Sequence, residues 1–332
     1  MVQDRVDEER LDAVGSIVVV EDVWGDALEK LAETHEVRRE PDAWIDPDLL
    51  RHAVAGADAV VVRNRALVTA ELLAAAPDLR IVARAGTGLD NIDVPAADRA
   101  GVVVSAALGA NAVSVAEHTL LLALALLRDL PKHDRAVRAG TWQRRPGREL
   151  SGRTWGLLGL GATGLAVAEL LRGFGTRVLA HDPYVDPAAE RVRAAGVTVC
   201  GIDTVLAESD VLSVHLPATD ETRNLLDTRL LDNVKDGAVL VSVGRGEVID
   251  EDALAGALTS GRLAGAALDV RAVEPPEPGP LDDLPSVIFS PHVAGITVES
   301  QERIVSVLAE DIAAVLDGGE AGHAVGAHRA AR

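Results

Sequence analysis

The sequence predicts an α/β protein built from two doubly wound parallel-sheet domains. Short apolar runs without polar alternation recur along the chain, which is typical of strands buried on both faces of a parallel sheet. Segments with helical spacing separate these runs, as in repeated strand–helix–strand units. At 332 residues, the chain is long enough to bury two separate cores.

The first third of the chain contains one set of these alternating segments. Thr69 is expected to cap the third helix, with Glu71 in its first turn near the positive end of the helix dipole. The expected strands are 16–20, 57–63, 79–83 and 102–104, and the expected helices are 25–34, 47–54 and 69–76. We expect this region to form one α/β layer.

A long helix is expected over residues 111–127, and it contains Glu117 and His118. Because this helix is apolar on nearly every side, it should be buried between domains or between subunits. Pro131 is expected to end it. Residues 140–153 are expected to form an irregular linker.

The alternation of strands and helices resumes at Trp155. The last helix is well placed to return to the first domain, which makes that domain discontinuous. We expect the first domain to comprise residues 1–107 and 297–332, and the second to span 108–296. The expected strands are 177–181, 197–200, 211–215, 238–243, 264–270 and 287–290, and the expected helices are 165–171, 222–231, 251–260 and 299–316.

A glycine-rich turn joins an apolar strand to the helix that follows it. Gly159 allows a sharp turn, Gly161 allows the backbone to approach a pyrophosphate, and Gly164 allows the helix to pack closely on the strand. The start of the helix, at Ala162 and Thr163, offers backbone N–H groups and partial positive charge to phosphates.

Asp182 closes the next expected strand, where a dinucleotide-binding unit places an acid for the ribose 2′-hydroxyl. A glycine cluster alone also occurs in ordinary turns, but here the strand, the helix and the acid are all present. A carboxylate would repel a 2′-phosphate, and Pro183 and Tyr184 follow it instead of an arginine. The sequence therefore predicts a Rossmann-like domain that binds NAD in preference to NADP.

The composition is that of a globular protein and disfavours several classes of function. Hydrophobic residues make up 48% of the chain and charged residues 25%, as in ordinary globular proteins. The formal net charge of −20 argues against a binder of nucleic acid or of anionic membranes. Cys200 is the only cysteine, so a reducing compartment is expected. Without a secretory signature or an apolar run that spans a bilayer, we expect a soluble, cytoplasmic protein.

Ligands of open α/β sheets bind beyond the carboxyl ends of the strands. Arg245, Glu274 and His292 follow three of the expected strands. A guanidinium suits the carboxylate and the carbonyl of a 2-keto acid. An imidazolium donates a proton to the carbonyl oxygen as a hydride arrives, and a neighbouring carboxylate favours the charged ring. Together these residues predict hydride transfer between NAD(H) and a small 2-keto or 2-hydroxy acid.

Each of these residues also has a less specific interpretation. A single arginine at a strand end is more often a member of a surface ion pair, and a histidine after proline is often a turn residue. His215 competes for the acid role, but no carboxylate follows it in a comparable position. We expect His118 to be a hydrogen-bonded core or interface residue and Cys200 to be a packing residue. We expect no metal, because no group of His, Cys, Asp or Glu has ligand spacing.

These stretches together resemble the D-isomer-specific 2-hydroxyacid dehydrogenases, and within that family the phosphoglycerate dehydrogenases. The resemblance extends over about residues 60–300. Besides the glycine turn, the matching segments are Arg-Ala-Gly-Thr-Gly at 84–88, Ser-Val-Ala-Glu-His at 114–118, Asp-Pro-Tyr at 182–184, His-Leu-Pro at 215–217, Arg-Gly-Glu at 245–247, Leu-Asp-Val at 268–270, Glu-Pro-Pro at 274–276 and Pro-His at 291–292.

The resemblance implies two Rossmann-like doubly wound domains with the active-site cleft between them, usually in a homodimer with the 111–127 helix at its interface. It implies that Arg245 binds the substrate carboxylate and carbonyl, and that Glu274 and His292 form the acid/base pair. The other implied substrate ligands are Arg63, Asn111 and the loop of Arg84, Ala85, Gly86, Thr87 and Gly88, whose N–H groups form an anion nest. The other implied cofactor ligands are His215, Pro217, Thr222, Val243, Gly244 and His292, and Asp269 near the nicotinamide amide.

The sequence departs from the family pattern in three places. Residues 242–246 are Ser-Val-Gly-Arg-Gly where the family typically has Asn-x-Ala-Arg-Gly, and Arg271 stands where the family usually has phenylalanine. The segment before Asn111 lacks the usual Asn-Thr-Pro character. The regulatory domain often fused to phosphoglycerate dehydrogenases has no counterpart, so we expect no feedback by such a domain. These departures leave the reaction class unchanged and bear on the substrate.

Arginines near the expected substrate loop indicate a second anionic group on the substrate. Arg63 and Arg65 follow one strand, and the phosphoglycerate enzymes also have an arginine at the position of Arg63; a solvated basic pair is the alternative. Weaker candidates, for reaching a neighbouring subunit's cleft, are Arg144, Arg145 and Arg148. We expect 3-phosphoglycerate first and phosphonopyruvate next, with glyoxylate or hydroxypyruvate reduction as alternatives.

Two other kinds of function stay open. Transcriptional co-repressors of this family keep the same fold, and such a protein would sense NADH and bind a partner peptide with negligible turnover. Formate oxidation is disfavoured, because the related formate enzyme has an amide where this chain has Glu274.

Overall fold

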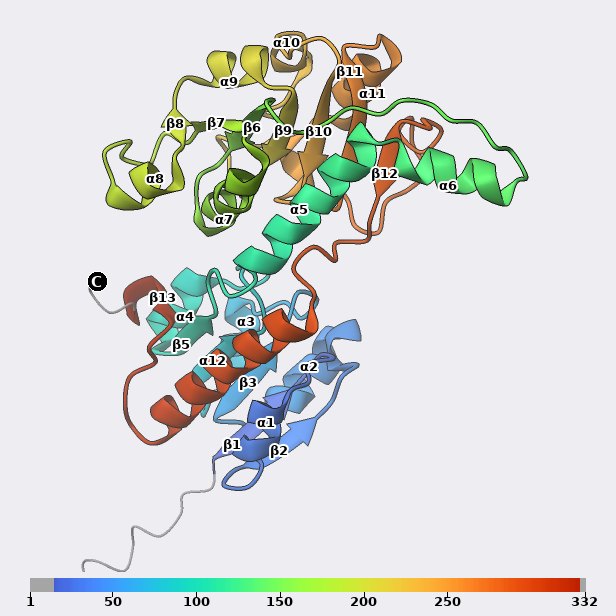
Figure 1. The fold of residues 1–332 in the computed structure, drawn as a ribbon. Coiled ribbons are helices and arrows are strands. Elements are labelled where there is room, and N and C mark those ends of the chain that lie inside the picture. Colours follow the sequence, from blue (N-terminus) through green and yellow to red (C-terminus); the bar gives the residue numbers. More distant parts are fainter. Residues whose placement is uncertain (1–14, 329–332) are drawn as a thin grey trace, which may run out of the picture. The chain divides into compact units, whose positions relative to one another are not determined.

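The computed structural model describes residues 15–328, which divide into two compact units (Figure 1). The first unit comprises the described residues up to Asn111 and those from Thr297 onward, and the second spans Ala112–Ile296. Each unit is organised around one sheet with helices on both of its faces.

The described part of the first unit contains a six-stranded sheet in the order β13-β5-β4-β3-β1-β2. The strands pair in parallel except for β13, which is antiparallel to β5. The strands are β1 (Ser16–Val19), β2 (Glu36–Arg39), β3 (Ala59–Val62), β4 (Ile81–Arg84), β5 (Val103–Ala106) and β13 (Ala324–Val325). The helices are α1 (Asp26–Leu31), η1 (Ala43–Ile45), α2 (Pro47–Val54), α3 (Ala70–Ala75), α4 (Val94–Ala100), α12 (Val298–Leu316) and η4 (Gly326–His328).

Alternate residues of the buried strands supply the two faces of this sheet. Ile17 and Val19 of β1 pack with α1 and α12 on one face, whereas Val18 packs with α2, α3 and α4 on the other. Figure 1 shows α12 alongside α1 over the sheet. Because both faces are covered, the strands are continuously apolar, as the sequence indicates.

The second unit contains a seven-stranded parallel sheet in the order β12-β11-β10-β9-β6-β7-β8. Its strands are β6 (Thr154–Leu158), β7 (Arg177–His181), β8 (Thr198–Val199), β9 (Val211–Val214), β10 (Ala238–Ser242), β11 (Leu263–Leu268) and β12 (Val287–Phe289). Its helices are α5 (Ala112–Leu127), α6 (Leu130–Arg138), α7 (Ala162–Leu171), η2 (Arg172–Phe174), α8 (Glu190–Ala195), α9 (Ile202–Glu208), α10 (Thr228–Leu231), η3 (Gly246–Val248) and α11 (Glu251–Thr259).

Two apolar clusters cover this sheet. Trp155 and Leu157 of β6 face α5 and α7, whereas Leu158 faces the side of α9, α10 and α11. The parallel arrangement brings the carboxyl ends of β6, β9, β10 and β11 to one edge. The candidate residues of this unit lie at that edge.

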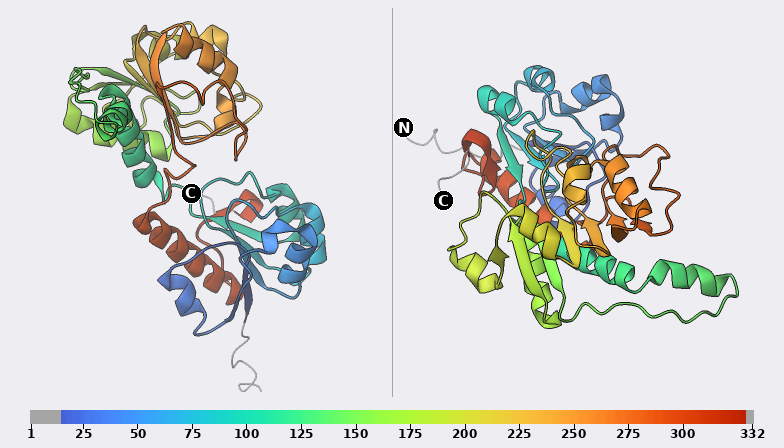
Figure 2. Two further views of the ribbon diagram at one scale, coloured as in Figure 1. Left: turned by 90° about the vertical axis from the view of Figure 1, so that its right-hand side faces the viewer. Right: turned by 90° about the horizontal axis from the view of Figure 1, so that it is seen from above.

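Several elements differ from the sequence-based expectation. Pro131 does not end the long helix, because α5 already ends at Leu127 and Asp129 has a positive φ of 50°. Pro131 instead stands in the first turn of α6, where its missing N–H costs nothing. Helix α6 has no buried residue and projects from the sheet of its unit (Figure 2). The helix expected over 222–231 is wrong in its first part, because Asn224 has a positive φ of 50° and only Thr228–Leu231 is helical.

Among residues 15–328, no helix is both long enough and apolar enough to cross a bilayer.

Candidate active site

The glycine turn follows β6 directly. Gly159 has a φ of +97°, and its N–H donates to His181 O of the neighbouring strand at 2.9 Å. A Cβ at Gly164 would lie 2.3 Å from Gly159 O, so a side chain there would separate helix α7 from the turn. Both positions therefore require glycine.

Helix α7 begins at Ala162 with Gly161 as its N-cap, and no side chain caps its first N–H groups. A Cβ at Gly161 would meet no described atom within 4 Å, so the space in front of the helix is open. Uncapped N–H groups facing open space suit a phosphate.

Asp182 follows β7 directly, and its side chain is hydrogen-bonded to the glycine turn. Its Oδ2 accepts from Leu160 N at 2.8 Å, and its Oδ1 accepts from Tyr184 N at 3.0 Å. Each carboxylate oxygen keeps further acceptor capacity for a ribose hydroxyl. Asp182 thus also stabilises the glycine turn, a contact that the sequence motif alone does not predict.

The expected cofactor ligands after β9 and β10 lie at the same edge. A Cβ at Gly244 would lie 2.6 Å from Leu216 O, which requires the two segments to be in close contact. The Thr222 hydroxyl donates to Pro217 O at 2.6 Å and accepts from Thr219 N at 2.8 Å, closing the loop after β9. Val243 precedes Gly244 and is buried.

His215 is enclosed beside the glycine turn. Its Nε2 lies 2.8 Å from Ser213 Oγ, which also accepts from Trp155 Nε1 at 2.8 Å. Its Nδ1 is buried and has no hydrogen-bond partner among the described residues. Burial lowers the pKa of His215 to about 4. The ring is therefore neutral near pH 7 and is a poor candidate for a proton donor.

Asp269 is a buried carboxylate immediately after β11. Its Oδ1 accepts from Ser290 Oγ at 2.6 Å and from Val293 N at 3.0 Å, and its Oδ2 accepts from Ala294 N at 2.8 Å. His118 Nε2 of α5 lies 3.1 Å from Ser290 Oγ and 3.6 Å from Asp269 Oδ1. Asp269 therefore fixes the segment 290–294 from inside the unit.

His292 stands in this segment with a positive φ of 54°, which is uncommon outside glycine. Its N–H donates to Asp269 O at 2.8 Å, so the unusual backbone is held by the strand end. Its Nδ1 lies 2.7 Å from Glu274 Oε2. Their side chains are 42% and 37% exposed, so a ligand can reach this pair.

The pKa of Glu274 is lowered. Burial alone would raise it, but the hydrogen bond with His292, the Arg271 N–H and the charges of His292 and Arg245 outweigh that cost. Arg245, whose Nη1 donates to Gly244 O at 3.0 Å, thus acts electrostatically on the same carboxylate. Arg245, Glu274 and His292 are brought together within the second unit.

Residues 120–294 match the family of the D-isomer specific 2-hydroxyacid dehydrogenases, through its NAD binding domain. The chain belongs to this family. The cofactor of its second unit is NAD(H), and the open, uncapped start of α7 and the acceptor atoms of Asp182 fit that molecule.

The similar proteins of this family include a phosphoglycerate dehydrogenase and two glyoxylate reductases. A D-3-phosphoglycerate dehydrogenase of Mycobacterium tuberculosis is 45% identical over 280 residues, which is 83% of this chain and 53% of that protein. The chain therefore spans about half the length of such curated relatives. A solved NADPH-dependent glyoxylate/hydroxypyruvate reductase of Sinorhizobium meliloti is 31% identical, with a TM-score of 0.81 over 95% of this chain and 98% of that one. A solved glyoxylate reductase of Paecilomyes thermophila is 27% identical, with a TM-score of 0.85 over 94% of this chain and 98% of that one.

The expected substrate ligands other than Arg245 lie in the first unit. Arg84 is buried, its Nη1 donates to Ala85 O at 3.0 Å, and Gly86 has a φ of +155°. Thr87 and Gly88 complete this loop after β4, and Asn111 is the last residue of the unit before Thr297.

Glu21 organises the loop that carries Arg63 and Arg65, and sequence reasoning did not select it. Its buried carboxylate accepts four successive N–H groups of residues 63–66, at 2.6, 3.2, 3.0 and 3.0 Å. The Arg63 Nη1 donates to Asp22 O at 3.2 Å, and the Arg65 guanidinium lies 4.6 Å from the centre of the Trp44 ring. The sequence does place Glu21, an acidic residue, directly after a buried strand, and this position could have marked it as a candidate.

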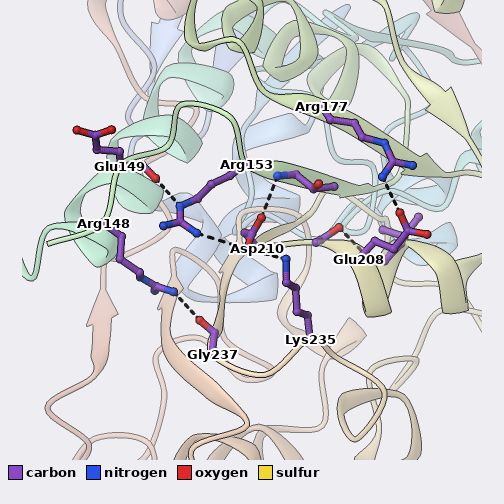
Figure 3. A network of polar contacts seen from close by, with 11 residues as sticks. Arg148, Glu149, Arg153, Arg177, Glu208, Asp210, Lys235 and Gly237 are labelled. Carbon is purple, nitrogen blue, oxygen red and sulfur yellow. Dashed lines mark hydrogen bonds and ion pairs between the residues drawn. The ribbon is translucent and has the colours of Figure 1, made fainter.

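At the amino-terminal edge of the second sheet, opposite the site, a polar network holds strand starts together (Figure 3). Asp210 accepts from Thr154 N at 3.0 Å and from Lys235 Nζ at 2.8 Å, and Arg153 lies 3.4 Å away. Arg148 donates to Gly237 O at 2.6 Å. Arg148 is thus engaged within its own unit, which disfavours a role in a neighbouring subunit's cleft.

Proposed function

We propose that this chain is an NAD(H)-dependent dehydrogenase that interconverts a D-2-hydroxy acid and its 2-keto acid. The observation that carries the proposal is the hydrogen-bonded Glu274–His292 pair, with Arg245 acting on the same carboxylate, in the unit that bears the glycine turn. An acid/base pair beside an arginine matches the needs of a keto acid whose oxygen gains a proton during reduction.

The residues of this chain have separate tasks in such a reaction. Bound NADH supplies the hydride that reduces the carbonyl carbon. Arg245 binds the substrate carboxylate and polarises the carbonyl. Glu274 engages Nδ1 of His292, so Nε2 is the nitrogen that gives its proton to the carbonyl oxygen. In the oxidative direction, neutral His292 accepts that proton from the hydroxyl group at the same nitrogen.

We infer a doubly anionic substrate, with 3-phosphoglycerate first and phosphonopyruvate next. Arg63 and Arg65 support this inference, because Glu21 holds the backbone of their loop in a defined conformation. The names of the relatives that are 45% identical point in the same direction. The alternative is a singly anionic substrate, because the solved reductases that resemble this chain are named for glyoxylate and hydroxypyruvate.

We further propose a homodimer through α5 and α6. Leu121 of α5 and Leu130 and Val137 of α6 are exposed, although helices of this unit bury such residues elsewhere. A second copy would remove this apolar surface from water. Sedimentation of Leu121→Glu and Leu130→Glu beside the wild type tests the dimer; unchanged mass would contradict it.

One screen tests the activity. NADH oxidation is measured with 3-phosphohydroxypyruvate, phosphonopyruvate, hydroxypyruvate and glyoxylate, for the wild type and for His292→Ala. Turnover that depends on His292 supports the dehydrogenase. NADH binding without turnover on any acid would favour an NADH-sensing protein of the co-repressor kind.

A further inference from the structure

We propose that Arg271, paired with Glu251, is a positioning residue that holds the Glu274 loop in register with Arg245 and His292. This inference rests on the proposed dehydrogenase function. Arg271 stands where the family usually has phenylalanine. A phenylalanine cannot form an ion pair, so this means of fixing the loop belongs to the present chain.

The Arg271 guanidinium is fixed by a two-pronged contact with Glu251. Nε donates to Oε1 at 3.0 Å and Nη2 donates to Oε2 at 2.8 Å, while Nη1 lies 3.5 Å from Asp282 Oδ1. The Arg271 side chain is only 9% exposed. A bidentate pair with little solvent access restricts geometry more than a surface ion pair does.

The same pair reaches the catalytic carboxylate through the backbone. Ala272 N donates to Glu251 Oε1 at 3.0 Å, which ties the loop to the start of α11. Arg271 N donates to Glu274 Oε1 at 3.1 Å, while Glu274 Oε2 faces His292. An unbroken series of contacts therefore runs from Glu251 to His292.

Arg271 also contacts the segments that carry the other two site residues. A Cβ at Gly246, next to Arg245, would lie 2.0 Å from the Arg271 carbonyl carbon, so the two backbones are in direct contact. The Arg271 guanidinium carbon lies 5.1 Å from the ring centre of Phe289, three residues before His292. Through its backbone and its guanidinium together, Arg271 thus contacts all three segments.

The experiment compares Arg271→Met, Arg271→Lys and Glu251→Gln with the wild type. The control is Arg177→Met, which breaks an exposed pair with Glu208 at the opposite edge of the sheet. We expect Arg271→Met to lower kcat on the order of tenfold, because small displacements of acid/base groups are costly. The dissociation constant of NADH should stay unchanged, Arg271→Lys should restore part of kcat, and the control should match the wild type.

The pH profile separates positioning from a loss of stability. Methionine keeps the backbone N–H of residue 271, but without the ion pair with Glu251 the loop should shift and weaken the hydrogen bond from this N–H to Glu274. The pKa of Glu274 should then rise, so the acid limb of kcat should move to higher pH in Arg271→Met. An active wild type and an Arg271→Met variant with the same kcat and the same acid limb would overturn the inference.

Hydrogen exchange keeps the inference independent of the proposed activity. The amides of Arg271 and Ala272 are hydrogen-bonded and should exchange faster in Arg271→Met and in Glu251→Gln. If the wild type reduces none of the keto acids, the proposed function fails, and the exchange rates alone decide on Arg271. Unchanged exchange of both amides would overturn its positioning role.

Discussion

Glu274 Oε2 lies 2.7 Å from His292 Nδ1, and this contact decides which nitrogen of the ring is left for a substrate. The histidine is also held from behind, since Asp269 accepts the N–H groups of the two residues that follow it. The ring is therefore oriented by one exposed carboxylate and by one buried carboxylate. Loss of either carboxylate should therefore change the position of Nε2 of His292.

Replacement of the two partners should have graded effects on turnover. We expect His292→Ala to lower kcat for keto acid reduction about 10²- to 10⁴-fold, the usual contribution of a positioned acid. Glu274→Gln should cause a smaller loss, because the amide keeps a hydrogen bond and loses the charge. NADH titration by fluorescence provides the control for Glu274→Gln, since Glu274 is neither part of the glycine turn nor an expected cofactor ligand. Near-wild-type kcat in His292→Ala would contradict the acid/base assignment.

The lowered pKa of Glu274 predicts the acid side of the rate profile. A carboxyl group with a lowered pKa stays ionised below its ordinary range. Reduction should therefore be maintained as the pH falls through the ordinary carboxyl range, and should decline only as the pH falls through the lowered value. Glu274→Gln removes this group, so its profile should lack that step. A wild-type profile that declines above the ordinary carboxyl range would count against the assignment.

Substitution of the arginines held by Glu21 should separate substrates by charge. Arg63→Ala combined with Arg65→Ala should reduce kcat/KM for 3-phosphohydroxypyruvate about tenfold or more, because each charged hydrogen bond contributes about 1.5–3 kcal/mol. The value for glyoxylate should change little. Arg51→Ala is the matched control, since Arg51 forms an exposed pair with Asp48 on α2. An equal loss for both acids would contradict the distal-anion hypothesis.

Asp182 should set the preference between the two dinucleotides. Asp182→Asn retains an oxygen that can accept from Leu160 N and removes the negative charge that repels a 2′-phosphate. We expect the affinity for NADPH relative to NADH to rise on the order of tenfold, measured by fluorescence titration. Asp186→Asn is the control, because the Asp186 side chain accepts a local N–H from Ala188 and is exposed. An unchanged ratio would show that another group governs the choice.

The elements at the centre of each sheet were predictable because their signals are local. The strand, turn and helix around Gly159 and Gly164 follow from nearby residues, and so does the cap at Thr69, whose hydroxyl accepts from Leu72 N. Strand β2 was missed because Glu36–Arg39 is an edge strand with polar residues and no apolar run.

Contacts between distant segments were not predictable in the same way. Glu21 meets residues 63–66 more than forty positions later, and Arg271 meets Glu251 twenty positions earlier. The sequence marks Arg271 only as a departure from a pattern. Its role follows from packing of three strand ends, which residue type and spacing do not encode.

At the opposite edge of the second sheet, Asp210 should contribute to stability rather than to turnover. Its side chain is 17% exposed and links the start of β6 to Lys235. Asp210→Ala leaves the Thr154 N–H without this acceptor, which should cost about 1–3 kcal/mol in the free energy of unfolding. Denaturant unfolding measures this loss, and kcat should stay near wild type. Asp236→Ala, in an exposed pair with Arg262, is the control and should change stability by less than about 1 kcal/mol.

The pH dependence of this contribution has a defined sign. Burial alone would raise the pKa of Asp210, but the Lys235 hydrogen bond, the Thr154 N–H and the charges of Lys235 and Arg153 together lower it. The stabilisation is therefore fully present above the ordinary carboxyl pKa and is lost as the pH falls through the lowered value. The stability difference between the wild type and Asp210→Ala should shrink in that acidic window. A difference that stays constant there would mean that the ionised carboxylate is not what stabilises these strand starts.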